Sequence, residues 1–137
     1  MGTEVRHHDR DGFATGLRAF FEYRDLGVRG ATGGRFGAHV IRAIPGRRTD
    51  GSWHRHRLDF QFVVVLSGEV TFDYEDIGRV TLRAGSTVLQ PPLIRHREVG
   101  HSDDLELIEI TSPAEFETET VDPPWDVPPN LRPETAR

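Results

Sequence analysis

Short apolar or alternating segments recur along the chain, separated by glycine, proline and aspartate. Seven of these segments predict β-strands: Phe36–Ile44, Trp53–Leu58, Phe60–Leu66, Val70–Tyr74, Arg79–Leu82, Thr87–Gln90 and Leu105–Thr111. Apolar and polar residues alternate in the fourth segment, whereas the third is almost continuously apolar, as in a strand that is covered on both faces. No segment has the spacing of a long amphipathic helix. The pattern therefore predicts an all-β sandwich or small barrel.

The two ends of the chain differ from this middle part. Residues 1–19 are polar and contain glycines, which predicts a loose leader before a barrel domain over residues 20–116. Residues 117–137 are acidic, and five of the nine prolines lie in the last stretch, from Val121 to Arg137. We expect this part to run over the surface as an extended tail without a core of its own.

Composition limits the chemistry. The chain has no cysteine, which excludes disulfides, iron–sulfur clusters and thiolate nucleophiles. All 17 residues of the Lys+Arg total are arginine, so a lysine Schiff base is also excluded. Any metal must be held by nitrogen and oxygen ligands, and acid–base chemistry must come from His, Asp, Glu or Tyr.

Charge and hydropathy bear on partners and location. The net charge is −5 and the pI is about 5.8, which argues against nucleic acid as a partner. No stretch reaches the length of about 18 to 20 apolar residues that a membrane span needs, and the polar N-terminus lacks the apolar region of a signal peptide. We expect a cytoplasmic protein without a membrane partner.

A candidate metal site comes from histidines in two separate segments. His54 and His56 lie two apart on a predicted strand, so both imidazoles turn to one face. His96 follows a Pro-Pro turn, and it could reach the same point only if the sheet closes into a barrel. Three imidazoles suit Fe, Mn, Zn or Ni and leave positions open for water or substrate. Taken singly, the His-x-His pair is more often an ordinary surface strand than a metal site, and His96 could be an ordinary loop residue.

Taken together, the two segments resemble the two motifs of the cupin superfamily. The first runs from His54 through His56 and Gln61 to Gly68, and the second from Gly85 through Pro91 to His96. The intervening residues 69–84 match the short inter-motif loop of small microbial cupins. The resemblance implies a double-stranded β-helix, the jelly-roll barrel of cupins, and a metal held by His54, His56, Gln61 and His96.

The sequence departs from the cupin pattern at several positions. Gln61 stands where the family usually has a glutamate ligand, and Leu93 stands where it usually has a glycine. A neutral amide oxygen is a weaker ligand than a carboxylate, and it leaves the full charge of the ion on the site. We therefore expect weaker metal retention and a stronger attraction for an anionic substrate, with Gln61 either in direct contact with the metal or orienting a water beside it.

Other residues near the motifs are candidates for substrate binding. Val63 and Val65 share the face of Gln61 and could form an apolar wall, or they could simply be core. Gln90 and Arg95 flank the second motif, and an arginine there could hold a carboxylate or phosphate. Glu109 and Tyr74 are candidates for a general acid or base, and the sequence alone does not place them on a face.

The resemblance to cupins implies a metal-dependent enzyme that acts on a small, anionic organic substrate. An oxygenase-type reaction is the leading candidate for its activity. A redox-neutral isomerase or lyase acting on a sugar or keto acid derivative is an alternative, and so is a non-catalytic small-molecule-binding barrel. We also expect a homodimer, because small cupins are commonly dimers and an exposed N-terminal edge strand needs to be covered.

Overall fold

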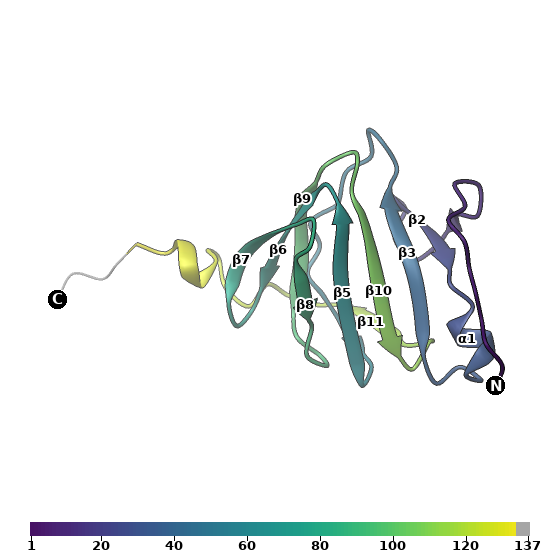
Figure 1. The fold of residues 1–137 in the computed structure, drawn as a ribbon. Coiled ribbons are helices and arrows are strands. Elements are labelled where there is room, and N and C mark those ends of the chain that lie inside the picture. Colours follow the sequence, from purple (N-terminus) through teal and green to yellow (C-terminus); the bar gives the residue numbers. More distant parts are fainter. Residues whose placement is uncertain (134–137) are drawn as a thin grey trace.

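Two antiparallel sheets face each other in the computed structural model, which describes residues 1–133 (Figure 1). The six-stranded sheet has the order β1 (Ala14–Thr15), β2 (Phe21–Asp25), β3 (Gly37–Ala43), β10 (Glu106–Ser112), β5 (Phe60–Ser67) and β8 (Thr87–Leu89). The five-stranded sheet has the order β11 (Glu117–Thr120), β4 (His54–Arg57), β9 (His96–His101), β6 (Glu69–Tyr74) and β7 (Gly78–Arg83). The described helices are short: α1 (Val28–Ala31) and the 3-10 turn η1 (Pro129–Leu131). The predicted all-β class is confirmed.

Each of the seven predicted segments contains a strand, and four strands were not predicted. These four strands, which lack the hydrophobic pattern of the predicted segments, are β1, β2, β9 and β11. β9 is polar because its inward side chains His96 and Glu98 line a cavity instead of a core. β1 and β11 extend the sheets beyond residues 20–116, the range expected for the barrel. The last residues of the expected tail, 134–137, lie outside the described part of the chain.

The third predicted strand differs from its sequence-based interpretation. In β5 the odd-numbered residues from Gln61 to Val65 are buried, while Phe60 and Leu66 remain 39% and 46% exposed. Within the described structure this strand is therefore covered on one face only, and the expectation of cover on both faces is wrong. The apolar outer residues add hydrophobicity to the sequence without adding to the core, so the alternation was hidden.

The core lies between the two sheets, beside the cavity described below. Its buried cluster consists of Ile41, Ala43, Val63, Val65, Val70, Leu82, Leu105 and Leu107. Each Val or Leu buried in this way contributes roughly 1.5–3 kcal/mol to stability. This packing fixes the distance between the sheets, and with it the positions of the polar side chains that point inward.

Polar contacts fasten the segment after β11 to the edge of the second sheet. The Asn130 side chain accepts a hydrogen bond from the backbone N–H of Arg79 at 2.9 Å and donates one to its carbonyl at 2.7 Å. The Trp125 indole N–H donates a hydrogen bond to the carbonyl of Glu75 at 3.2 Å. The Trp125 ring packs edge-on against the Trp53 ring, with 4.9 Å between the ring centroids. These contacts attach Trp125 and Asn130 to the edge of the five-stranded sheet, and the extended surface tail stays a prediction.

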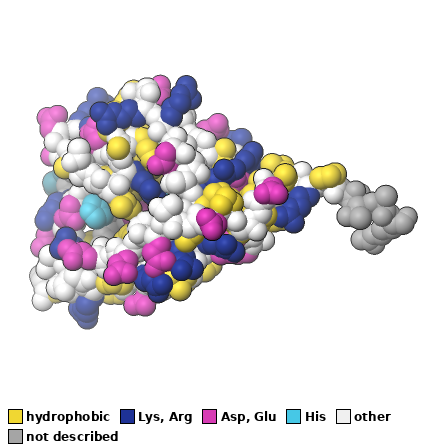
Figure 2. All heavy atoms as spheres, turned by 180° about the vertical axis from the view of Figure 1, so that it is seen from behind, with side chains coloured by type: hydrophobic (Ala, Val, Ile, Leu, Met, Phe, Trp, Pro, Cys, Tyr) yellow, Lys and Arg dark blue, Asp and Glu magenta, His cyan; other side chains and the backbone are white. Residues whose placement is uncertain are grey.

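Charged side chains of both signs are interspersed on the face of the molecule shown in Figure 2. Ion pairs join neighbouring strands, such as Arg55 with Glu119 at 2.9 Å and Arg83 with Glu69 at 3.4 Å. Among residues 1–133, no helix combines the length and apolar character needed to cross a bilayer.

Candidate metal centre

The three histidines predicted as ligands come together on the inner face of the five-stranded sheet. His54 and His96 lie directly opposite each other on β4 and β9, and His56 is two residues further along β4. The ring centroids are 4.2 Å apart for His54 and His96, and 5.0 Å apart for His54 and His56. One ring nitrogen from each of the three residues lies within 4.8 Å of the others. All three side chains are buried.

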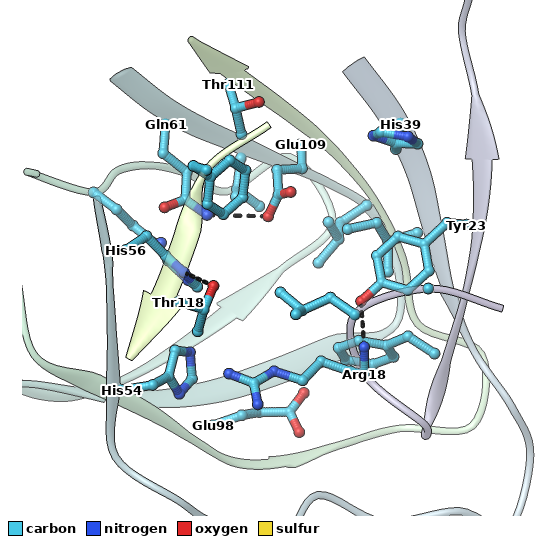
Figure 3. A pocket seen from close by; sticks show the side chains of 18 of the residues that line it. Arg18, Tyr23, His39, His54, His56, Gln61, Glu98, Glu109, Thr111 and Thr118 are labelled. Atoms are coloured by element: carbon cyan, nitrogen blue, oxygen red, sulfur yellow. Dashed lines mark hydrogen bonds between the residues drawn. The ribbon is translucent and has the colours of Figure 1, made fainter. Parts of the chain in front are cut away.

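Hydrogen bonds at the second ring nitrogen orient each imidazole. His54 Nδ1 donates to the Ser52 carbonyl at 3.2 Å, and His96 Nδ1 donates to the Ile94 carbonyl at 3.0 Å. His56 Nδ1 lies 2.8 Å from Thr118 Oγ1 on β11, a contact drawn in Figure 3. A carbonyl oxygen only accepts, so the proton of His54 and His96 sits on Nδ1 and the lone pair on Nε2. Metal-binding histidines commonly use one ring nitrogen for the ion and hydrogen-bond the other to a protein group in this way.

The surroundings keep these imidazoles neutral. Burial lowers the pKa of His54 to about 2, with further lowering by His96 and Arg18. Burial also lowers the pKa of His56 to about 3 and that of His96 to about 4. A metal binds the neutral form of imidazole, so no proton has to be removed near neutral pH. Buried, neutral, convergent nitrogen donors fit a divalent transition metal.

The loop before β9 belongs to the second motif, and a hydrogen bond links it to the first motif. Leu93 donates its backbone N–H to the carbonyl of His56 at 3.1 Å, which ties this loop to β4. Leu93 has φ 63°, a left-handed conformation that usually favours glycine. Leucine therefore adopts a backbone conformation here that glycine, the residue expected at this position from the resemblance to cupins, adopts more readily. The tie places His96 opposite His54.

Gln61 points into the same cavity from the opposite sheet. It is 3% exposed on β5, and its Nε2 donates to Glu109 Oε2 at 3.1 Å (Figure 3). The amide nitrogen is thereby occupied, and the amide oxygen is the atom left for a metal or a water. Burial raises the pKa of Glu109, and the hydrogen bond from Gln61 opposes this rise. Whether Gln61 contacts a metal directly stays a prediction.

The cavity beside the histidines has a volume of about 590 Å³, within the usual range for small-molecule sites. Of the predicted substrate-binding residues, Val63 and Gln90 line it. The Gln90 side chain accepts a hydrogen bond from the Tyr74 hydroxyl at 2.7 Å. Tyr74 also stacks on His96, with 5.8 Å between ring centroids, so it supports the imidazole ring of this predicted ligand.

The other two predicted substrate-binding residues do not line this cavity. Val65 belongs to the core cluster, where it is 1% exposed. The Arg95 side chain forms an ion pair with Glu75 at 3.1 Å. The sequence places Arg95 close to His96, but alternation along a strand turns neighbouring side chains in opposite directions. We therefore correct the placement of both residues.

Several cavity residues were not assigned to the site from sequence. Arg18 lies in the turn between β1 and β2, inside the expected leader, and its side chain enters the cavity. Thr118 lies in the expected tail. Glu98 lines the cavity two residues after His96, and His101 Nδ1 lies 3.1 Å from each of its carboxylate oxygens. Alternation from His96 could have identified Glu98, whereas nothing local in the sequence indicates Arg18 or Thr118.

Comparisons with known proteins agree with this architecture. Residues 40–111 match the family model described as the cupin domain. A comparison with curated proteins found no match.

Similar solved structures include Pac13, described as a nucleoside dehydratase, which is from Streptomyces. Its TM-score is 0.63 at 13% identity, over 85% of this chain and 91% of that chain. The Fe(II) form of HppE has a TM-score of 0.62 at 18% identity, over 80% of this chain. This chain spans only 60% of the length of HppE. KdgF from Halomonas sp. has a TM-score of 0.58 at 20% identity, over 77% of this chain and 88% of that chain.

Proposed function

Because the chain belongs to the cupin family, we propose that it is a metal-dependent enzyme acting on a small, anionic organic substrate, with an oxygenase-type reaction as the first candidate. The observation that carries this proposal is the convergence of His54, His56 and His96 at the wall of a cavity of about 590 Å³. Their neutral rings leave one nitrogen each for an ion, and the open space beside them accommodates a substrate.

The proposed metal is Fe, Mn, Zn or Ni, held by the three histidines, with Gln61 as a further ligand or as the residue that orients a water. When bound, such an ion supplies Lewis-acid chemistry or the activation of O₂. The set of neutral ligands leaves the positive charge of the ion uncompensated, which favours a substrate that brings negative charge.

Glu109 is the proposed acid–base residue of the site. Burial raises its pKa, so the carboxyl group holds a proton more readily than an exposed glutamate does. Its Oε2 accepts the hydrogen bond from Gln61, so Oε1 is the atom that would carry or receive a proton. This is the kind of group that a proton transfer within the cavity requires.

The same residue supports a second candidate, a redox-neutral isomerase or lyase that acts on a sugar or keto acid derivative. In that reaction Glu109 would move a proton, and an ion held by the three histidines would supply Lewis-acid chemistry. A barrel that binds a small molecule without turning it over needs no such acid–base residue, and it is the third candidate.

Oxygen consumption separates these candidates. The metal-loaded protein is incubated with a panel of enediols, β-diketones, thiol acids and keto acids, in an oxygen electrode and in an anaerobic chamber. An oxygenase consumes O₂ together with substrate and shows no turnover without it. Equal turnover in both conditions eliminates the oxygenase and supports the isomerase or lyase. Binding without turnover of any compound supports the non-catalytic barrel.

We also propose that the protein forms a homodimer through its N-terminal edge. β1 ends the six-stranded sheet, pairs only with β2 among the described strands, and has both residues exposed. Its free backbone groups are available to a strand of a second copy. Sedimentation equilibrium should give twice the chain mass of 15.5 kDa. A monomer mass at all concentrations would contradict this proposal.

A further inference from the structure

The backbone of Arg18 is held in place at the cavity wall. Its backbone N–H donates to the Tyr23 hydroxyl at 3.1 Å, and its carbonyl accepts from the Phe21 N–H at 3.2 Å. Phe20, two residues after Arg18, is 8% exposed, which anchors the turn. In Figure 3 the guanidinium extends into the pocket toward His54. Arg18 is also among the groups that lower the pKa of all three clustered histidines, after burial.

This guanidinium has no partner among residues 1–133. No described acceptor forms a hydrogen bond with it, no described carboxylate lies within ion-pairing distance, and Nη2 is buried. By contrast, the partly buried Arg42 and Arg55 form ion pairs with Glu22 and Glu119. Leaving a buried charged donor without an acceptor costs free energy. A ligand that supplies an acceptor removes this cost and therefore binds more tightly.

The acidic residues of the cavity are already engaged. The Glu98 carboxylate faces His101 Nδ1, and Glu109 accepts from Gln61. Asp50 accepts hydrogen bonds from the backbone and side chain of Ser52. Glu115, which also lines the cavity, pairs with Arg29, and none of these four carboxylates forms a hydrogen bond or ion pair with the Arg18 guanidinium.

We propose that Arg18 binds the anionic end of the substrate, a carboxylate or a phosphoryl or phosphonyl group. The fork of guanidinium N–H groups matches two oxygens of either anion. The cavity wall also carries the apolar side chains of Ile41, Val63 and Phe72. The substrate class is accordingly a small organic acid with an apolar portion that contacts these side chains, held at its charged group by Arg18 next to the histidine cluster. This inference rests on the proposed function for the role of the bound acid as substrate, but anion binding itself needs no metal.

Direct binding to metal-depleted protein tests the inference without a reaction. Isothermal titration calorimetry would use phenylacetate and phenylphosphonate, which share an apolar ring and differ in the anion, and phenylacetamide as the neutral analogue. We expect wild-type protein to bind at least one of the anions more tightly than the amide. The better anion identifies the substrate group. Equal binding of anions and amide would overturn the inference.

Arg18→Gln should weaken binding of the better anion by about tenfold or more, as expected for loss of a charge-assisted hydrogen bond. Arg18→Lys keeps the charge but loses the fork, and we expect an intermediate loss, which gives a second test if the glutamine variant folds poorly. Arg10→Gln makes the same charge change at an exposed position outside the cavity, and it should bind as wild type does. Unchanged affinity in Arg18→Gln or Arg18→Lys would overturn the inference.

A separate metal titration keeps the two proposals apart. Arg18→Gln retains all three histidines, so it should take up a divalent metal to the same level as wild type. If wild-type protein binds the anion through Arg18 but takes up no metal, the proposed function fails and the anion site stands. If metal binds normally and Arg18→Gln leaves anion affinity unchanged, the anion site fails and the proposed function stands.

Discussion

Acidification should destabilise the metal-free protein through its three clustered histidines. Their pKa values of about 2, 3 and 4 lie below the ordinary value of 6.5, chiefly because of burial. The unfolded chain therefore binds three more protons than the folded chain at mildly acidic pH. Stability from this source is complete above pH 6.5 and is lost as the pH falls toward the folded-state values.

The magnitude follows from the difference between the two states. At about pH 5, protonation of one ordinary histidine favours the unfolded state by about 2 kcal/mol, so the three together contribute about 6 kcal/mol. A small domain has a total stability of about 5–15 kcal/mol, so most of it would be lost at that pH. The carboxylates whose pKa is lowered titrate at still lower pH and do not contribute in this interval.

Urea unfolding of the chelator-treated protein at several values between about pH 8 and pH 5 measures this loss. The free energy of unfolding should fall as the pH drops, and His54→Gln should reduce the slope by about one proton. Glu109, whose pKa is raised by burial, and His39, whose pKa is lowered by burial, affect the slope of both proteins alike, so the difference between them reports on His54. His8→Gln replaces an exposed histidine and serves as the matched control, with the wild-type slope. A free energy of unfolding that stays constant over this interval would refute the buried, neutral cluster.

Two further substitutions test the surroundings of the site. Gln61→Glu adds a charged oxygen opposite the histidines and should slow metal loss to a chelator by about tenfold or more; an unchanged chelator curve would mean that Gln61 does not contact the ion. Asp73, which is 0% exposed, accepts hydrogen bonds from Arg79 and Arg97, and these outweigh the effect of burial to hold its pKa below the usual range. Asp73→Asn should lower the free energy of unfolding by about 2 kcal/mol near neutral pH, since both arginines stay about one third exposed and can rehydrate. Asp76→Asn is the exposed control, and equal stability of the two variants would contradict the ion-pair role.

Much of the fold could be predicted because the strands carry a clear local pattern. The two histidines of β4 share a face by the two-residue period of a strand, and the second motif supplies His96 once the sheet closes. β9 could not be predicted by hydrophobicity, because a strand that lines a polar cavity presents His96 and Glu98 inward. Where the inward residues of a strand are polar because they line a site, the strand lacks the alternation of apolar and polar residues on which its prediction depends.

The parts of the site that the sequence did not reveal depend on long-range packing. Arg18 reaches the cavity because the turn after β1 is held by Tyr23 and by the buried Phe20, contacts that the composition of residues 1–19 does not indicate. Thr118 reaches His56 only because β11 pairs with β4. Arg95 shows the opposite case, in which a residue adjacent to a ligand in sequence points away to Glu75.

The metal content of wild-type protein and of His96→Ala, measured by elemental analysis after loading and gel filtration, tests the central claim most directly. Three nitrogen donors from two strands predict one divalent ion per chain in the wild type and well below one in the variant, while His39→Ala, which removes a cavity-lining histidine outside the cluster, stays fully loaded. Full occupancy in His96→Ala, or no retained ion in the wild type, would contradict a metal centre built by these histidines.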